Sequence, residues 1–245
     1  MRLKLISCEV LYREMCDAIA RSPHQVDAEF LPKGLHDLGG VAMNKRLQEL
    51  VDQTDPAMYD AILMGYALCG NGLLGLTARA IPIVAPRAHD CIALLMGSRQ
   101  RYQEYFDSNP GVFFRSTGWL ERGKGLIPLS RERTGIDVSL QDLIDKYGEE
   151  NGRYLFEELN NYQSHYRQMT YIQTELDPNG SFEEQAREEA VKRGWSFAKI
   201  TGDLTLFRRL VWGEWDPADF VTVPPGHRIT VRYDDDILDV ERGAE

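Results

Sequence analysis

The residues of this sequence that could do thiol or soft-metal chemistry are four cysteines and five histidines. His89 and Cys91 form a His-x-Cys pair, and Cys69 and Cys8 precede it. Thiolate and imidazole together suit zinc, and the same side chains would suit an iron–sulfur cluster. Cys69, His89 and Cys91 would leave an open, catalytic position, whereas Cys8 as a fourth ligand would close the site as a structural one. We therefore predict a metal site, with zinc as the cofactor, at Cys8, Cys69, His89 and Cys91.

The same residues also permit interpretations without a metal. Cys91 would begin a helix, and because a helix N-terminus lowers the pKa of a thiol, Cys91 would act as a nucleophile with His89 as its base. Asp90 would instead only cap that helix. Free cysteines are also often buried as small apolar residues, which is our expectation for Cys16 in the middle of a helix.

Glycines and basic side chains indicate where a substrate would bind. The run Gly70, Asn71 and Gly72 permits a turn that presents backbone N–H groups to an anion at a helix start, although a turn that only packs a helix fits equally. Arg99 would bind a carboxylate or phosphate, or pair with an acid such as Glu104. Two further histidines lie in glycine-containing loops. We predict substrate contacts at Gly70, Asn71, Gly72, Arg99, His36 and His227.

The composition narrows the class of protein. The chain has 245 residues, 43% of them hydrophobic, and a net charge of -10. This charge argues against nucleic acid and anionic membrane surfaces as partners, because both are polyanionic. No apolar run approaches the roughly 18 residues that span a bilayer, and the N-terminus lacks the features of a signal peptide. We expect a cytoplasmic protein, whose thiols stay reduced rather than forming disulfides.

Predicted strands and helices alternate along the chain, which is typical of an α/β fold with mainly parallel sheets. In such sheets ligands bind beyond the carboxyl ends of the strands, where Cys8, His36, Cys69, His89 and His227 all lie. The apolar patterns predict strands at 3–8, 26–30, 59–70, 81–90, 112–120, 169–176, 195–203 and 219–229. They predict helices at 11–21, 42–53, 71–79, 91–106, 139–166, 181–195 and 204–215, with a break near Gly148 or Gly152 and a capping box at Ser181 and Glu184.

The alternation falls into two Rossmann-like lobes. Residues 1–120 would form the first and carry the Cys/His site, 121–165 would connect, and 166–245 would form the second. The segments AEFLPKGLHD and YDAILMGYALCG in the first half echo FAKITGDLTL and ADFVTVPPGHR in the second. In each half a strand ends at a glycine loop, a helix follows, and a second strand ends in glycine. This echo suggests an internal duplication.

Several segments resemble one family: CEVLYREM, VDAEFLPKGLHD, YDAILMGYALCGNGLLGLTAR, IPIVAPRAHDCIALLMGSRQRY and STGWLE. They are similar to the uncharacterised bacterial and archaeal family numbered 1638 among domains of unknown function. The resemblance implies that Cys8, Cys69, His89 and Cys91 are family positions. Members are often encoded beside corrinoid-dependent methyltransferases, so it also implies a role near methyl or one-carbon transfer with a corrinoid protein as partner. Zinc methyltransferases of that metabolism carry a His-x-Cys pair and a distant Cys, whereas the third Cys here precedes the pair.

Three functions follow from these observations. The first is a zinc-dependent methyltransferase or accessory protein, in which the metal site activates a thiol or a small anionic substrate. The second is a two-lobed protein that binds a small molecule or corrinoid without catalysis. The third is an iron–sulfur or redox thiol protein. An α/β fold by itself is compatible with all three.

Overall fold

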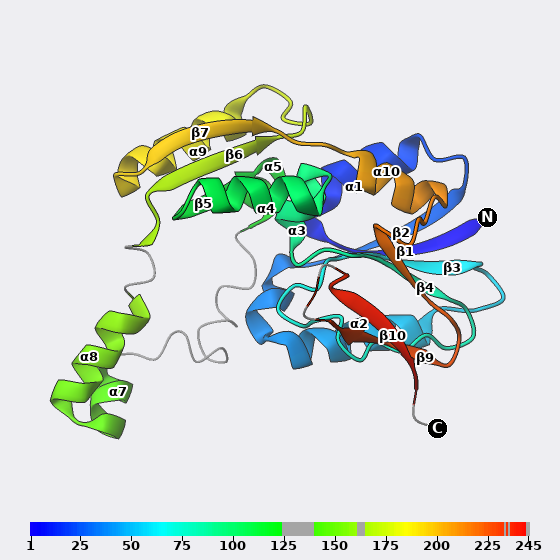
Figure 1. The fold of residues 1–245 in the computed structure, drawn as a ribbon, viewed down its shortest axis with the longest axis horizontal. Coiled ribbons are helices and arrows are strands. Elements are labelled where there is room, and N and C mark those ends of the chain that lie inside the picture. The colour runs from blue at the N-terminus through cyan, green and yellow to red at the C-terminus, as the bar shows by residue number, and fades with distance from the viewer. Residues whose placement is uncertain (124–139, 161–164, 233, 235, 244–245) are drawn as a thin grey trace.

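A computed structural model describes residues 1–123, 140–160, 165–232, 234 and 236–243 (Figure 1). Its larger sheet has the strand order β2-β1-β3-β4-β8. The first four strands are parallel, and β8 runs antiparallel to β4. The central strand β3 is buried at all five positions, as expected for a parallel strand covered on both faces. The strands are β1 (Arg2–Cys8), β2 (Gln25–Leu31), β3 (Ala61–Gly65), β4 (Ile83–Pro86) and β8 (Phe220–Val223).

Helices cover both faces of this sheet. α1 (Tyr12–Ala20) and α10 (Thr205–Trp212) pack together on one face, and α2 (Gly40–Gln53) lies on the other (Figure 1). The connections β1–α1–β2 and β2–α2–β3 move in opposite directions across the sheet, and right-handed crossovers then require helices on opposite faces. The α/β fold with Rossmann-like parallel sheets is therefore confirmed.

A second, three-stranded parallel sheet has the order β5-β6-β7. Its strands are β5 (Val112–Ser116), β6 (Gln168–Gln173) and β7 (Ser196–Thr201). Met169 and Tyr171 of β6 pack against α9 (Ser181–Arg193). Thr170 points to the opposite face, where its hydroxyl bonds that of Tyr105 in α4 (Arg99–Ser108) at 2.9 Å.

The sheets do not follow the order of the chain. β5 precedes residue 120 but pairs with β6, and β8 follows residue 166 but pairs with β4, so strands of both sheets cross the expected lobe boundaries. The internal duplication is not confirmed. β2 and β3 both lie beside β1, whereas β7 and β8, their expected counterparts, belong to different sheets.

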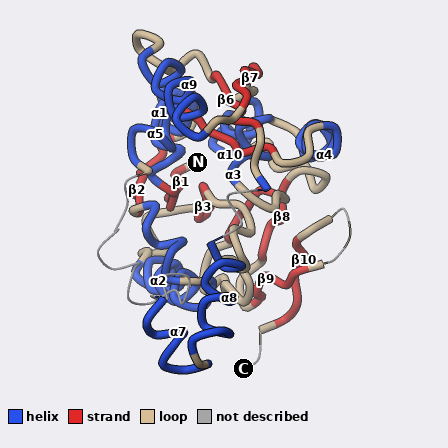
Figure 2. The backbone as a smooth tube through the Cα atoms, turned by 90° about the vertical axis from the view of Figure 1, so that its left-hand side faces the viewer, coloured by secondary structure: helices blue, strands red, loops and turns tan. Residues whose placement is uncertain are grey.

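Smaller elements complete the description. α7 (Leu140–Tyr147) and α8 (Glu149–Asn160) pack against each other as a helical hairpin that breaks at Gly148, as predicted (Figure 2). β9 (His227–Val231) and β10 (Leu238–Arg242) form an antiparallel pair, so the strand predicted at 219–229 is β8 followed by the start of β9. Of the predicted connection at 121–165, residues 124–139 and 161–164 lie outside the described residues. None of the described helices is long and apolar enough to cross a membrane.

Three local predictions are wrong. The helix predicted at 91–106 is two helices, α3 (Cys91–Met96) and α4, because Gly97 adopts a left-handed conformation with φ +71°. Residues 71–75 form turns instead of a helix. The Ser181 side chain does not cap α9; the backbone N–H groups of Phe182 and Glu183 donate to Asp177 Oδ2 instead.

Candidate functional site

Three cysteines converge at the carboxyl end of the larger sheet. Cys8 ends β1, Cys69 lies in the loop after β3, and Cys91 begins α3 after β4. These strands are adjacent and parallel, so their carboxyl ends share one edge. Backbone bonds also join the two loops: Leu68 N–H donates to the Ala88 carbonyl, and Cys69 N–H donates to the His89 carbonyl, both at 2.9 Å. The fold thus fixes Cys69 beside the segment that leads into Cys91.

Cys8 and Cys91 are buried, Cys69 is partly buried, and the three thiols interact electrostatically. Burial raises the pKa of Cys8 and of Cys69 to about 12, and it raises the pKa of Cys91 well above its usual range. A negative charge on Cys8 further raises the pKa of Cys69, and a charge on Cys69 or Cys8 raises that of Cys91. The predicted lowering of the Cys91 pKa by the helix start is therefore wrong, because desolvation dominates. Without a ligand, all three are neutral thiols near pH 7.

Polar side chains surround the thiols. His36 Nε2 lies 3.7 Å from Cys8 Sγ, and Trp119 Nε1 donates to Cys91 Sγ at 3.3 Å. Tyr66 is 1% exposed, and its hydroxyl has no hydrogen-bond partner among the residues that the structure describes. Burial raises the Tyr66 pKa, and charge on Cys8 or Cys69 raises it further, which places this phenol among the thiols. A buried hydroxyl without a partner is costly, so this atom marks a place where a ligand would be stabilised.

The Cys69 loop has an unusual backbone. Cys69, Gly70 and Asn71 have successive φ values of +47°, +65° and +70°. Such a conformation costs a cysteine on the order of 1 kcal/mol or more, and it clusters at functional sites. The loop packs tightly on α2, since a Cβ added at Gly40 would lie 2.5 Å from the Gly70 carbonyl oxygen. No helix begins behind Gly72, where the described residues form turns, so the predicted anion cradle lacks its helix N-terminus.

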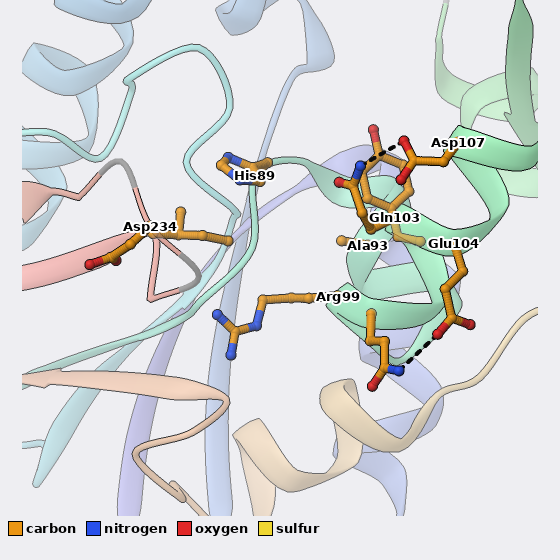
Figure 3. A pocket seen from close by; sticks show the side chains of 10 residues that line it. His89, Ala93, Arg99, Gln103, Glu104, Asp107 and Asp234 are labelled. Carbon is orange, nitrogen blue, oxygen red and sulfur yellow. Dashed lines mark hydrogen bonds between the residues drawn. The ribbon is translucent and has the colours of Figure 1, made fainter. Parts of the chain in front are cut away.

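His89 and Arg99 line a separate polar cavity of about 460 Å³ (Figure 3). Arg99 Nη2 donates to the Ala218 carbonyl at 2.8 Å, while its buried Nη1 has no hydrogen-bond partner in the described part of the chain. Glu104, the acid considered as a partner for Arg99, accepts instead from Gln100 at 2.8 Å. Within the described part of the chain, the His89 ring forms no hydrogen bond to a thiol.

A second cavity of about 600 Å³ lies against Cys91 and Trp119. Tyr102 contributes to the walls of both cavities, and its hydroxyl donates to Asp90 Oδ2 at 3.1 Å. Asp90 Oδ1 accepts from the backbone N–H groups at the start of α3, which confirms Asp90 as the cap of that helix.

Comparison with known proteins identifies the family. Residues 30–211 match the model of the family described as "Protein of unknown function (DUF1638)". The chain belongs to this family. The DUF1638 match includes His36, Cys69 and Cys91, whereas Cys8 precedes it. Neither the search of curated proteins nor that of solved structures gave a significant match.

In this DUF1638 chain, the predicted site residues fall into three places. Cys8, Cys69 and Cys91 lie together, with His36 beside Cys8 instead of in a separate substrate site. His89 and Arg99 line the polar cavity. His227 begins β9, where its Nδ1 lies 3.0 Å from the Pro225 carbonyl oxygen and it contacts none of the thiols. Among the residues that the structure describes, no group of three or more His, Cys, Asp or Glu side chains already has the geometry of a metal site.

Other features of the site were not predicted. The buried Tyr66 phenol follows β3 within an apolar run, so its sequence context indicates only core packing. The Trp119–Cys91 contact joins two helices that follow different sheets: Trp119 lies in α5 (Thr117–Arg122) after β5, and Cys91 begins α3 after β4. Cys16, expected in the core, is partly exposed and lines a surface hollow with Arg13 and Glu121.

Proposed function

We propose that this protein binds zinc through Cys8, Cys69 and Cys91 and uses the site to activate a thiol or another small substrate. The convergence of three thiols from three adjacent strand ends, two of them buried and that of Cys69 partly buried, carries this proposal. All four cysteines are free, which fits a ligand set better than a disulfide framework. The cytoplasm, where thiols stay reduced, is the compartment we propose.

The donor set fits zinc. Three thiolates can hold zinc and leave the fourth tetrahedral position open to a substrate thiol. His36, the imidazole nearest to a thiol, would orient Cys8. The position of His36 favours it over His89, whose ring lines the polar cavity. Since the side chains do not yet have metal-site geometry, binding requires the thiols to turn toward a common point. The buried Tyr66 hydroxyl would then gain a thiolate or a bound substrate as its partner.

Bound zinc would lower the pKa of a substrate thiol, so that the thiol reacts as a thiolate near pH 7. The surrounding residues would tune this site. Trp119 N–H holds Cys91 and lowers its pKa, and the positive charge of Lys33 lowers the pKa of Cys8. Donors of this kind orient ligands and offset the negative charge of several thiolates. Burial of Cys8 and Cys91, 2% and 7% exposed, keeps water from the site.

We propose methyl or one-carbon transfer as the context of this chemistry, with a corrinoid protein as partner. This part of the proposal comes from the family resemblance. Zinc-activated thiolates are nucleophiles suited to accept a methyl group, which makes the context chemically consistent with the site.

A binding protein without catalysis is the second candidate, and the two cavities of about 460 and 600 Å³ favour it. Their volumes suit small-molecule ligands. In that case a ligand would raise the melting temperature without being converted.

Elemental analysis of protein purified anaerobically and without a tag tests the metal. We expect about one zinc per chain, lost in Cys8→Ser, Cys69→Ser and Cys91→Ser and retained in the matched control Cys16→Ser. His36→Ala should lose more zinc than His89→Ala. Iron with acid-labile sulfide and a brown colour would instead select the iron–sulfur alternative. Protein that binds neither metal, even after incubation with excess zinc, would refute the proposal.

A further inference from the structure

The 600 Å³ cavity beside Cys91 has walls of aromatic rings. It is lined by Phe113 and Phe114 of β5, Tyr102 and Phe106 of α4, Trp119 and Tyr166. Phe113 and Phe114 are neighbours in an edge strand, so they border the cavity from opposite faces of the smaller sheet. The rings pack in pairs: the centroids of Phe113 and Tyr166 lie 5.1 Å apart, and those of Tyr102 and Phe114 lie 6.1 Å apart. Such walls offer π surfaces and dispersion contacts to a ligand.

The charged groups of this cavity are already paired. Arg115 donates to both carboxylate oxygens of Glu189, at 2.9 and 3.0 Å, and its guanidinium lies 4.5 Å from the centre of the Phe113 ring. Asp90 accepts from two backbone N–H groups and from the Tyr102 hydroxyl. A bidentate pair of this kind resists displacement by a ligand. The cavity thus differs from the polar one, where Arg99 Nη1 has no partner.

We infer that this aromatic cavity binds an uncharged aromatic group and presents it to Cys91. Ring stacking stabilises such a ligand, and because the ligand is uncharged, its binding requires no desolvation of a charged group. The cavity binds this aromatic group with or without a metal. That the substrate of the thiol site is an aromatic thiol rests on the proposed zinc function. The other cavity presents charged groups, Arg99 together with the carboxylates of Glu104, Asp107 and Asp234, so the two cavities offer different chemistry.

Benzyl alcohol is the probe for the cavity alone, titrated into metal-free protein and followed by ligand-observed NMR. Phe106, 46% exposed at the rim, allows a substitution with little risk to the fold. Phe106→Asp should weaken binding at least 5-fold, because it removes a ring and adds a charge. Tyr154→Asp, at a 62% exposed position in α8, is the matched control and should leave binding unchanged.

The cation benzyltrimethylammonium separates ring recognition from cation recognition, since aromatic walls also attract cations. We expect it to bind at least 5-fold more weakly than benzyl alcohol. Tighter binding of the cation, strengthened further by Phe106→Asp, would overturn the inference. So would failure of benzyl alcohol to bind, or an equal loss of benzyl alcohol affinity in Phe106→Asp and Tyr154→Asp.

Benzyl mercaptan tests the link to the metal. With zinc loaded it should bind at least 10-fold more tightly than benzyl alcohol, and this advantage should vanish in Cys69→Ser. Mercaptoacetate, an anionic thiol, should gain less affinity from the bound zinc than benzyl mercaptan does. If the protein holds no zinc but benzyl alcohol still binds with the expected dependence on Phe106, the proposed function fails and the cavity assignment stands. If zinc binds and mercaptoacetate gains more than benzyl mercaptan, the aromatic-substrate inference fails alone.

Discussion

Glu14 is a buried carboxyl group whose ionisation should limit the stability of this protein above pH 6. It lies in α1 and is 0% exposed. The Thr174 hydroxyl donates to Glu14 Oε1 at 3.1 Å, and Glu14 Oε2 accepts no hydrogen bond from the described residues. Burial raises its pKa from 4.5 to about 6, against the opposing effects of its backbone hydrogen bond and of Thr174. The folded state therefore binds this proton more tightly than the unfolded chain does.

The magnitude follows from linkage. One pKa unit corresponds to about 1.4 kcal/mol, so a shift from 4.5 to about 6 corresponds to about 2 kcal/mol. This stability is fully present below pH 4.5, where both states are protonated, and it is lost as the pH rises through 6. Glu14→Gln keeps an acceptor for Thr174 and cannot ionise. We expect the variant to exceed the wild type by about 2 kcal/mol at pH 8 and by less at pH 5.

Urea unfolding at pH 5, 6, 7 and 8 measures this difference, because the linear extrapolation gives the free energy of unfolding at each pH. Glu188→Gln, at an exposed position paired only with Lys192, is the control and should change stability by less than about 1 kcal/mol at every pH. A Glu14→Gln protein that is equally stable at all four pH values, or less stable at pH 8, would falsify this reasoning.

Two further predictions concern the thiol site, and a third concerns the packing of the helix Thr117–Arg122, α5. Apparent zinc affinity should fall by up to about 1,000-fold per pH unit between pH 8 and 6, because three neutral thiols must release protons; chelator competition measures this, and a slope below tenfold per unit would contradict it. Trp119→Phe removes the donor to Cys91 and should slow alkylation of that thiol about 10-fold at pH 8, as followed by mass spectrometry; an unchanged rate would show that the bond does not stabilise the thiolate. Gly118→Ala would place a Cβ 1.7 Å from the Val10 carbonyl oxygen and should cost about 3 kcal/mol in urea unfolding, whereas a loss below about 1 kcal/mol would mean that α5 shifts freely.

The convergence of the cysteines could be predicted from sequence because it depends on strand ends alone. Each cysteine follows an apolar run, and parallel strands bring their carboxyl ends to one edge whatever the details of the loops. The α/β class follows from the same alternation. The assignment of β8 to the first sheet could not be predicted, because an antiparallel edge strand has the same apolar pattern as a parallel one.

Side-chain direction was harder to predict than position. His89 and Cys91 are two residues apart, yet His89 lines the polar cavity and Cys91 the aromatic one. The left-handed backbone at Cys69 sets the direction of its thiol. The residue type does not predict this conformation, because glycine and asparagine, which favour it, follow Cys69 instead of occupying its position. The His36–Cys8 contact depends on a short 3₁₀ turn whose geometry local patterns do not determine.

The late arrival of β8 has a consequence for how the chain folds during synthesis. Pro86 of β4 pairs with Phe220, so about 130 residues must be made before the edge of β4 is covered. At roughly 5–20 residues per second, the ribosome leaves this apolar edge open for on the order of ten seconds. An unpaired strand edge is a template for association with other chains. Nascent chains stalled between these two points should therefore depend on chaperones more than the finished protein does.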